Sequence, residues 1–390
     1  MEVLPVRNHC TIVRFLLLVF CAAVFCNVHG SAVAQDSDNM LVLRIDPTTE
    51  YPRNSEGAFV TLKDGVIMYA YTQFYGGDDD HSKARIVSIE SHDGGLTWSN
   101  PPVVLVENIG EQNVMSVSLL RLKSGRIAHF YLIKNSLHDL KPVVQFSGDE
   151  AKTWSEAIPI ITAYGYFVMN NDRVIQLESG RLIAPLAFHR PIYRDGEQSA
   201  DWRGVAIWYL SDDEGKTWYE SDYWWALPVP DTGTGMQEPG VVELADGSIF
   251  SWARTNTGFQ YGFRSTDRGK SFSPPEPTSL VSPVSPASIK RIPGTSDLLA
   301  VYNDHSGRFP FTEKRRTPLV AAISKDGGRT WPIARVIEGD PDGHYCYTAI
   351  HFVGNHVLLA YCAGFLSNKD MYGLNPHRIR RVSIDWLYGK

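Results

Sequence analysis

The sequence predicts an all-β fold, a six-bladed β-propeller of four-stranded antiparallel blades. Three observations indicate it: six hairpin patterns of alternating apolar residues, five copies of an S-x-D-x-G-x-T-W turn, and no helical periodicity over any useful length. The turns begin at Ser91, Ser147, Ser211, Ser265 and Ser324, so they recur about every 54 to 64 residues. That spacing suits four-stranded propeller blades.

Residues 1–34 are expected to form a secretory signal peptide and to lie outside the fold. Basic residues such as Arg7 precede the apolar run Phe15 to Cys26, and a small-x-small cleavage site ends at Ala34. The apolar run is too short to cross a bilayer. We therefore expect one propeller domain over residues 35–390, exported to the periplasm or the extracellular space and without a membrane partner after cleavage.

Composition and cysteine content narrow the classes of partner and scaffold. The formal net charge is −6 and no run of basic residues occurs, so nucleic acid is not an expected partner. Only Cys346 and Cys362 remain after signal cleavage, which excludes a disulfide-built scaffold. They fall almost in cross-strand register in one hairpin, so a disulfide and two buried thiols both stay open. The protein is expected to be a monomer.

Six segments carry the hairpin pattern, in which apolar residues alternate on both sides of a Gly-containing turn. Each is expected to supply the two inner strands of one blade. They are Gly57–Thr72, Val117–Leu132, Asp172–Phe188, Pro239–Arg254, Ala287–Asn303 and Tyr347–Cys362.

The repeated turn is expected to be structural. Its Asp accepts backbone N–H bonds across the turn, and its Gly supplies a positive φ. Its Trp offers a large apolar surface that seals one sheet against the next. Ala151 replaces the Gly in the second copy and Phe272 replaces the Trp in the fourth, so the role tolerates substitution.

The sixth blade has no such turn, and its strands are expected to come from both ends of the chain. Its third strand is predicted at His377–Tyr388, and Met40–Ile45 is available as the missing fourth. Closing the ring in this way removes free sheet edges.

Strand order then predicts the functional face. If each inner strand starts on one face, the loop after each hairpin returns to that face, whereas the repeated turn lies on the opposite one. Several arginines that converge with acids and a tyrosine favour a site for an anionic ligand. The strand starts contribute Arg53, Asn113, Asp172, Arg173, Glu238, Ser285 and Tyr347, and the loops contribute Asp78 to His81, Lys134, His189, Arg190, Arg254, Asp304 to Arg308, Arg315 and Arg316.

Five S-x-D-x-G-x-T-W turns (Asp boxes) on an exported six-bladed propeller resemble the sialidase (neuraminidase) family, over nearly all of residues 40–390. The stretch QEPGVVELADGSIFSWART, Gln237–Thr255, is similar to the sialidase segment in which a Glu opens an inner strand and an Arg closes the next. The resemblance implies that Glu238 is the partner of the nucleophile and that Arg254 is the second carboxylate-binding arginine.

Further segments extend the resemblance. HYCYTAIHF implies a nucleophilic Tyr347, and RTPLVAAISKDGG implies the third arginine at Arg316. YPRNSEGAF implies the first arginine at Arg53, and the loop after the first hairpin implies an acid/base aspartate at Asp80. Three of these assignments keep a neighbour as the alternative: Arg315 for Arg316, Tyr345 for Tyr347, and Asp78 or Asp79 for Asp80.

The implied activity fits these residue types. Three guanidinium groups hold the carboxylate of sialic acid by charge-assisted hydrogen bonds, and that carboxylate repels an acidic nucleophile but not a phenol. Glu238 takes the phenolic proton, while Asp80 protonates the leaving oxygen and then activates water. The resemblance implies an exo-acting retaining glycoside hydrolase that releases a terminal sialic acid or a related acidic sugar from glycans, with no metal or organic cofactor.

The sequence departs from the sialidase pattern in two ways. Arg-Asn-Ser at Arg53 replaces the family's Arg-Ile-Pro, and Asn113, Arg173 and His189 add polar groups that the shared constellation lacks. These three are candidates for binding another part of a sugar or for bracing the loops. Asp172 and Arg173 are also consistent with an internal ion pair.

Two other functions stay open. A polysaccharide lyase acting on uronic acids would neutralise the carboxylate with arginines while His189 or a tyrosine abstracts the neighbouring proton. A non-catalytic carbohydrate-binding propeller is the other, because a fold does not fix a function.

Overall fold

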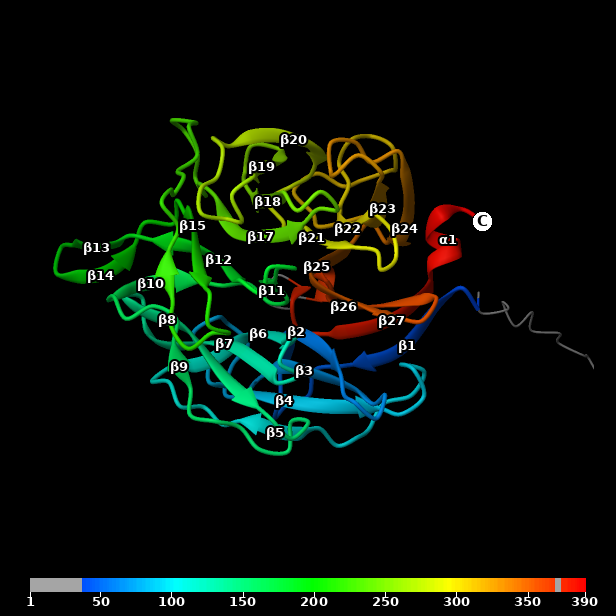
Figure 1. Cartoon of the computed structure of the whole chain (residues 1–390), viewed down its shortest axis with the longest axis horizontal. Coiled ribbons are helices and arrows are strands. Elements are labelled where there is room, and N and C mark those ends of the chain that lie inside the picture. Colours follow the sequence, from blue (N-terminus) through cyan, green and yellow to red (C-terminus); the bar gives the residue numbers. More distant parts are fainter. Residues whose placement is uncertain (1–36, 369–372) are drawn as a thin grey trace, which may run out of the picture. The chain divides into compact units, whose positions relative to one another are not determined.

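β-Strands make up almost every regular element of the chain. The computed structural model describes residues 37–368 and 373–390. Within them, strands are accompanied by a 3-10 turn, η1 (Leu366–Asn368), and a short helix, α1 (Ile384–Tyr388), which confirms the predicted all-β class (Figure 1). No helix of these residues is long and apolar enough to span a bilayer. The predicted signal peptide, residues 1–34, lies outside the described residues.

Three antiparallel sheets correspond to the first, fourth and fifth predicted hairpins, and each follows the order of its strands in the chain. The first contains β2 (Arg53–Thr61), β3 (Ile67–Phe74), β4 (Ala84–Ser91) and β5 (Val103–Val106). The second contains β17 (Gln237–Glu243), β18 (Ile249–Arg254), β19 (Phe259–Ser265) and β20 (Glu276–Val281). The third contains β21 (Ser288–Arg291), β22 (Leu298–Asn303), β23 (Leu319–Ser324) and β24 (Ile333–Glu338).

The last sheet joins the two ends of the described chain. Its strands are β25 (Gly343–Val353), β26 (His356–Phe365), β27 (His377–Ser383) and the N-terminal β1 (Asn39–Ile45). β1 pairs antiparallel with β27, so the predicted pairing of the terminal strands is present. The strand predicted at His377–Tyr388 is too long, because the chain turns into α1 after Ser383, whose hydroxyl accepts the Trp386 N–H at 3.2 Å as a helix cap.

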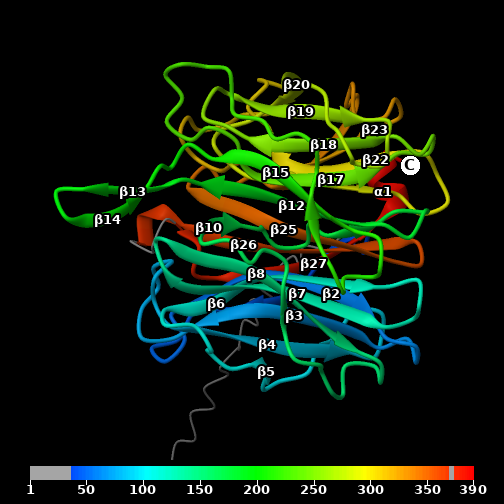
Figure 2. The ribbon, with the colours of Figure 1, turned by 60° about the vertical axis from the view of Figure 1, so that its left-hand side comes forward.

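The second and third hairpins share one sheet instead of forming separate four-stranded sheets. β10 (Gly165–Val168) runs parallel to β8 (Asp139–Ser147), with Gly165 opposite Asp139, and this pairing joins the strands of the second hairpin to those of the third. A further hairpin, β13 (Pro191–Arg194) and β14 (Glu197–Ala200), extends away from the other strands in Figures 1 and 2. The shared sheet contains β6 (Asn113–Arg121), β7 (Ile127–Ser136), β8 (Asp139–Ser147), β9 (Ile158–Pro159), β10 (Gly165–Val168), β11 (Ile175–Gln176), β12 (Leu182–His189), β15 (Val205–Ser211) and β16 (Tyr219–Glu220).

The five Asp boxes share one hydrogen-bond pattern. In the first, Asp93 accepts the backbone N–H of Thr97 at 2.9 Å and the Thr97 hydroxyl at 2.6 Å. A Cβ added to Gly95, whose φ is 89°, would lie 2.6 Å from Leu358 of the last sheet. The turns therefore act structurally, by fixing one sheet against its neighbour. The same pair of contacts is made by Asp149, Asp213, Asp267 and Asp326.

Apolar clusters join neighbouring sheets. Phe59 and Val87 of the first sheet pack with Leu358 and Ile379 of the last sheet. Comparable clusters join the first sheet to β6–β8, β12 and β15 to β17–β19, the β17–β20 sheet to the β21–β24 sheet, and the β21–β24 sheet to the last. Each sheet thus buries its faces against two others, which holds the strand starts in fixed relative positions.

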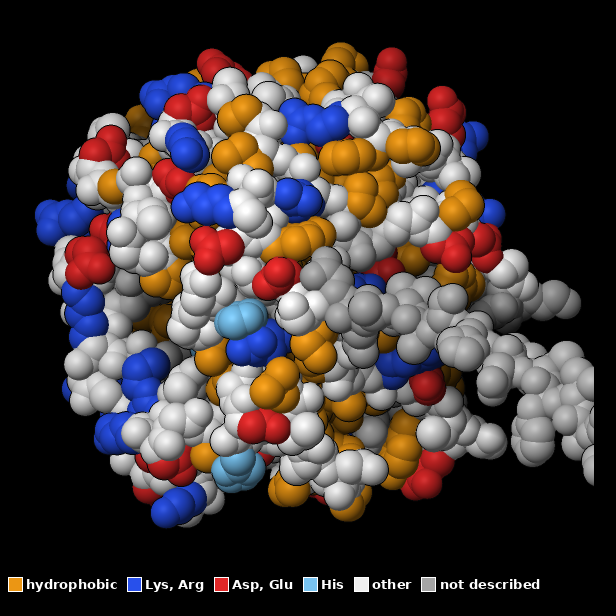
Figure 3. All heavy atoms as spheres, turned by 90° about the vertical axis from the view of Figure 1, so that its right-hand side faces the viewer, with side chains coloured by type: hydrophobic (Ala, Val, Ile, Leu, Met, Phe, Trp, Pro, Cys, Tyr) orange, Lys and Arg blue, Asp and Glu red, His pale blue; other side chains and the backbone are white. Residues whose placement is uncertain are grey.

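Acidic and basic side chains are interspersed on the surface that Figure 3 views. Surface ion pairs include Arg181 with Asp212, at 2.7 Å, and Arg126 with Glu214, at 3.1 Å. Exposed pairs of this kind contribute at most about 1 kcal/mol each to stability, so the apolar clusters dominate the energetics of the fold.

Candidate active site

Four strands that open hairpins carry the same β-bulge. The pairing register shifts near the start of β2, β6, β17 and β25. The bulged residues, Glu56, Ser116, Glu238 and Tyr347, have φ values of 52°, 61°, 49° and 58°. The left-handed conformation costs an L-residue about 1 to 2 kcal/mol, and such strain concentrates at functional sites. All four side chains line one cavity.

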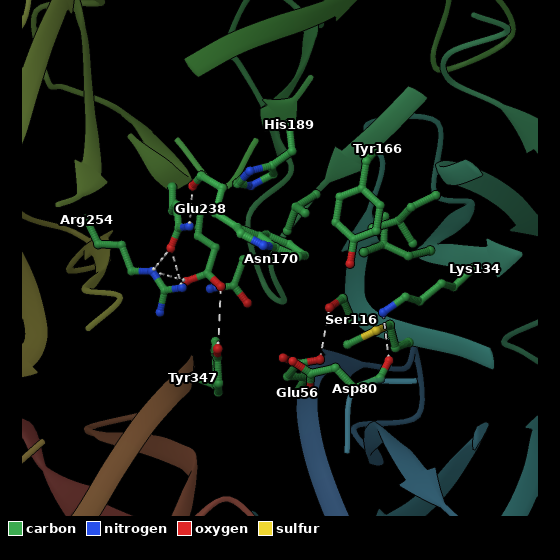
Figure 4. Close-up of a pocket in the computed structure, with 16 residues that line it drawn as sticks. Glu56, Asp80, Ser116, Lys134, Tyr166, Asn170, His189, Glu238, Arg254 and Tyr347 are labelled. Atoms are coloured by element: carbon green, nitrogen blue, oxygen red, sulfur yellow. Dashed lines mark hydrogen bonds and ion pairs between the residues drawn. The ribbon is translucent and has the colours of Figure 1, made fainter. Parts of the chain in front are cut away.

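The cavity has a volume of about 230 Å³. Asp80, Arg254 and Tyr347 also line a neighbouring opening of about 750 Å³, whose wall includes Arg316 and His344. The two spaces together are large enough for a sugar ring. Figure 4 labels the following residues of the smaller cavity: Glu56, Asp80, Ser116, Lys134, Tyr166, Asn170, His189, Glu238, Arg254 and Tyr347.

Tyr347 and Glu238 form a hydrogen-bonded pair at the cavity wall. The Tyr347 hydroxyl donates to Glu238 Oε1 at 3.4 Å. Burial, followed by the Glu238 carboxylate, raises the pKa of the Tyr347 phenol well above its usual range. The alternative tyrosine, Tyr345, is fully buried in the apolar cluster that contains Tyr361. The structure therefore brings Tyr347, and not Tyr345, to the predicted glutamate.

Arg254 is held in place by its neighbours and keeps one nitrogen unpaired. Its Nε and Nη2 donate to Gln237 Oε1 at 3.1 and 2.6 Å, and its Nε also lies 3.1 Å from Glu238 Oε2. Its Nη1 is buried without a hydrogen-bond partner. An unpaired buried N–H beside a cavity favours binding of an acceptor there, because leaving it unsatisfied costs free energy.

Arg316 lies beside the ring of Tyr347. Its Cζ is 5.6 Å from the centroid of the Tyr347 ring, and its side chain lines the wider opening. The alternative arginine, Arg315, is directed to Asp342 at 3.9 Å. Of the two candidates, the structure brings Arg316 to the site.

Arg53 is close to the site but does not line either cavity. It is 1% exposed and donates through Nη1 to Asp80 Oδ1 at 2.6 Å. Partial burial raises the pKa of the Asp80 carboxyl, but the Arg53 guanidinium outweighs it and the pKa lies below its usual range. The rival acids point elsewhere: Asp78 accepts the Asn375 amide at 3.0 Å, and Asp79 accepts the His81 N–H at 2.6 Å.

Two predicted sugar-binding residues brace the structure instead of lining the cavity. Asn113 donates its amide hydrogens to the carbonyls of Asp80 and Ser82, at 3.0 and 2.9 Å, and so supports the Asp80 loop. Arg173 donates to the Ala287 carbonyl at 2.8 Å and to the Ser288 hydroxyl at 3.2 Å. Both residues are buried, which fits a supporting role.

The ion pair between Asp172 and Arg173 that the sequence left open is not present. Asp172 instead pairs with Lys290 at 2.7 Å and accepts the Ile350 N–H at 2.9 Å. His189 does line the cavity, with its Nδ1 3.1 Å from the Asp201 carbonyl. Burial lowers the pKa of His189 to about 4, so its ring is neutral near pH 7.

Sequence reasoning missed Glu56 and assigned no role to Lys134, although both line the cavity. Burial raises the pKa of Glu56 to about 7 and lowers the pKa of Lys134 to about 8. The Lys134 ammonium donates to the Asp80 carbonyl at 2.8 Å. A signal for Glu56 existed, since it stands directly before the first predicted hairpin pattern, Gly57–Thr72, as Glu238 stands directly before the fourth, Pro239–Arg254.

The two cysteines belong to the same small buried cluster as Tyr347. Cys346 and Cys362 are paired across β25 and β26, and both are buried free thiols. The Cys362 sulfur lies 3.2 Å from the Ser55 hydroxyl. Of the two states that the sequence left open, the structure contains the thiols.

Comparison with known proteins identifies the family. The sequence pattern described as the BNR repeat-like domain matches residues 65–358. The chain belongs to the BNR repeat-like domain family. This BNR-repeat chain is also similar to a sialidase from Micromonospora viridifaciens, with 24% identity over 363 residues. The aligned region covers 79% of this chain and 50% of the sialidase. It therefore spans about half the length of that curated relative.

Solved structures share the fold of this BNR-repeat chain. A protein of unknown function from Dyadobacter fermentans is 18% identical, with a TM-score of 0.69 over 89% of this chain and 100% of that chain. The intramolecular trans-sialidase from Ruminococcus gnavus is 15% identical, with a TM-score of 0.67 over 89% of this chain and 98% of that chain. The resemblance to the sialidases predicted from the Asp boxes is thereby confirmed.

Proposed function

We propose that this protein is an exo-acting retaining glycoside hydrolase that releases a terminal sialic acid or a related acidic sugar from glycans. The observation that carries the proposal is the Tyr347–Glu238 hydrogen bond of 3.4 Å, with Arg254 and Arg316 in the adjoining walls. A relative at 24% identity is a sialidase, which supports the same class of activity.

The proposed chemistry begins with the substrate carboxylate on the arginines. The unpaired Nη1 of Arg254 and the guanidinium of Arg316 attract it by charge-assisted hydrogen bonds. Tyr347 attacks the anomeric carbon while Glu238 accepts the phenolic proton, because a phenol with a raised pKa needs a base at its oxygen. An acid/base group then completes a double displacement with retention.

In this proposal Arg53 binds the substrate carboxylate after that carboxylate replaces Asp80 as its partner. Its Nη1 donates to Asp80 Oδ1 at 2.6 Å and to the Asp78 carbonyl at 3.2 Å, so a substrate carboxylate reaches that nitrogen by replacing Asp80. The Asp80 side chain is 61% exposed, and its displacement into water is therefore sterically open.

The proposal includes the architecture around the site. We expect the sheets to form six blades of one propeller over residues 35–390, because each shares an apolar cluster with its neighbours and the first packs against the last. The strand starts would then surround the axis, where the four bulged residues meet. Export by a signal peptide remains part of this proposal.

A chromogenic sialoside assay tests the function. The wild type is expected to release the chromophore, and Tyr347→Phe, which removes only the hydroxyl, is expected to lower kcat/KM by about 1000-fold or more, on the scale of a lost nucleophile. Equal turnover by the two proteins, or none by either on any sialoside, would remove the proposal.

The position of His189 favours a second candidate function, that of a lyase acting on uronic acids. His189 is a neutral imidazole in the same cavity as Arg254, and a neutral imidazole is able to abstract a proton next to a carboxylate. An unsaturated product that absorbs in the ultraviolet would identify this reaction. Glycan binding with no product from any acidic glycan would instead identify a binding protein.

A further inference from the structure

Asn171 joins two of the bulges that line the cavity. It lies in the loop between β10 and β11 and is 1% exposed. Its amide nitrogen donates to the Gly57 carbonyl at 2.8 Å and to the Tyr347 carbonyl at 3.1 Å. Both acceptors are backbone oxygens, so only the NH2 end of the amide is able to bind them. Asn171 thus uses one donor hydrogen on the first hairpin and the other on the last.

The acceptors of Asn171 lie where the strand pairing is interrupted. A register shift on β25 takes Tyr347 and Thr348 out of the regular pairing with β26. A shift on β2 does the same to Glu56 and Gly57. Buried backbone carbonyls need hydrogen-bond donors, and the Asn171 amide supplies one at each bulge. Figure 4 shows Glu56 and Tyr347 reaching the same cavity from different strands.

The second carbonyl of the Tyr347 bulge is bound from the fifth hairpin. The Ser288 hydroxyl donates to the Thr348 carbonyl at 2.5 Å. The Arg173 guanidinium in turn donates to the Ser288 hydroxyl at 3.2 Å. Both backbone carbonyls of this bulge are therefore fixed by side chains of other hairpins.

The loop that carries Asn171 is itself anchored to the second hairpin. The Asp172 N–H donates to the Val117 carbonyl at 3.0 Å, and the Arg173 N–H donates to the Ser118 hydroxyl at 3.0 Å. Both acceptors belong to β6. The position of Asn171 is therefore fixed independently of the two bulges that its amide contacts.

Stability alone does not explain the amide. The Asn171 Oδ1 is buried and has no hydrogen-bond partner among the described residues. A buried acceptor without a partner costs free energy, and most buried polar atoms are paired. The Tyr347 backbone, with a φ of 58°, is in a conformation that persists only where its surroundings hold it. These observations favour a role of Asn171 in placing the bulges.

We infer that Asn171 is a positioning residue for the nucleophile of the proposed hydrolase. The inference rests on the proposed function. Asn171 lines neither cavity, so it acts through Tyr347 and not on the sugar. It holds the Tyr347 backbone so that the phenol faces the anomeric carbon while its hydroxyl stays on Glu238, at 3.4 Å. A misplacement of about 1 Å costs up to about 100-fold in rate.

Asn171→Ala separates attack by Tyr347 from binding of the sugar. Its kcat/KM for a nitrophenyl sialoside is expected to fall about 10- to 100-fold. Its dissociation constant for free sialic acid, measured by titration calorimetry, is expected to change less than about threefold, because Arg254 and Arg316 are untouched. An unchanged kcat/KM in the folded variant would overturn the inference, as would equal losses of affinity and of kcat/KM.

Lys290→Met is the matched control. Lys290 donates to the Ile350 carbonyl at 2.7 Å, on β25 but in its regularly paired part, and pairs with Asp172. The variant is expected to lower the melting temperature, because it leaves a buried carboxylate without its cation. Its kcat/KM at a temperature where it is folded is expected to change less than about twofold. A fall as large as that of Asn171→Ala would overturn the inference, because any weakening of β25 would then suffice.

Two variants at Ser288 keep the test available if Asn171→Ala does not fold. Ser288→Ala removes the donor to the Thr348 carbonyl and is expected to lower kcat/KM about tenfold. Ser288→Thr keeps a hydroxyl and is expected to retain kcat/KM within about threefold of the wild type. Wild-type kcat/KM in Ser288→Ala would overturn the inference that the bulge carbonyls position Tyr347.

Hydrogen exchange separates the inference from the proposed function, because it needs no substrate. In Asn171→Ala, the peptides that cover residues 53–58 and 345–349 are both expected to exchange about tenfold faster, since one amide holds both bulges. In Lys290→Met, the first of these peptides is expected to exchange at the wild-type rate. Unchanged exchange of both peptides in Asn171→Ala would overturn the inference even in an active hydrolase. Faster exchange of both, in a protein whose wild type cleaves no sialoside, would remove the proposed function and retain Asn171 as the link between the bulges.

Discussion

Three arginines near the cavity differ in what already holds them. Arg53 is neutralised by Asp80, and Arg254 is shared between Gln237 and Glu238. Arg316 instead lies against the ring of Tyr347 and lines the wider opening. Because Asp80 already neutralises the charge of Arg53, the affinity for an anion is expected to depend more on Arg254 and Arg316.

Arg316 and its sequence neighbour provide a matched pair of variants. Arg316→Ala removes a guanidinium beside Tyr347 and is expected to weaken binding of free sialic acid about 10- to 100-fold, which is the scale of a charge-assisted hydrogen bond. Arg315→Ala removes only the long contact to Asp342, at 3.9 Å, and is expected to change affinity less than about twofold. Titration calorimetry on both variants measures the difference. Equal losses would show that the anion does not bind beside Tyr347.

At the scale of elements, a residue with positive φ occurs at two kinds of position, the Asp-box turns and the strand bulges. The Asp boxes place a residue with positive φ at the turn, and the bulges place one at the cavity. Glycine serves the turn in four copies, but Ala151 occupies it in the second with a φ of 64°. The bulged residues carry polar side chains that line the cavity. This indicates that the strained backbone conformation serves to direct those side chains into the cavity.

The second Asp box is therefore open to stabilisation. Ala151→Gly relieves about 1 to 2 kcal/mol of left-handed strain and loses one partly buried methyl group, worth up to about 0.8 kcal/mol. A net gain between about 0.2 and 2 kcal/mol in the free energy of unfolding is expected in urea titrations. Gly95→Ala, where the new Cβ meets Leu358 at 2.6 Å, is expected to destabilise by about 2 to 4 kcal/mol. A loss of stability in Ala151→Gly would contradict this account of the turn.

The hairpins were predictable because apolar and polar residues alternate in the sequence, which indicates strands with one buried face. The parallel pairing of β8 with β10 was not, because it depends on contacts between segments that no local pattern specifies. The choice between Tyr345 and Tyr347 illustrates a second limit. Regular alternation gives both side chains the same face, and only the bulge after Cys346 separates them.

The site also contains some residues that the sequence predicts and others whose role depends on the folded surroundings. Glu238, Arg254 and Tyr347 were predicted from the resemblance to sialidases, and the structure brings them together. Glu56 was missed because its importance comes from burial, which raises the pKa of its carboxyl group and is not visible in the sequence. Asn113 is a polar residue at the start of an inner strand, as predicted. Its amide hydrogens are nevertheless donated to the carbonyls of the Asp80 loop, so they are not available to a sugar.

At the scale of the whole molecule, the fold brings together groups that are far apart in the sequence. Glu56 and Tyr347 come from the first and last hairpins, and the last sheet contains strands from both ends of the described chain. The Asp boxes and apolar clusters fix the sheets, and this rigidity holds the strained bulges around one cavity. The proposed activity depends on that convergence.

The most direct test is covalent trapping of the nucleophile. A 3-fluorosialyl fluoride has a good leaving group and a slowed second step, so it accumulates the glycosyl-enzyme intermediate of a retaining hydrolase. Peptide mass spectrometry of the inactivated wild type is predicted to find one fluorosialyl group on Tyr347. Labelling of a carboxylate such as Glu238, or no labelling at all, would contradict the account.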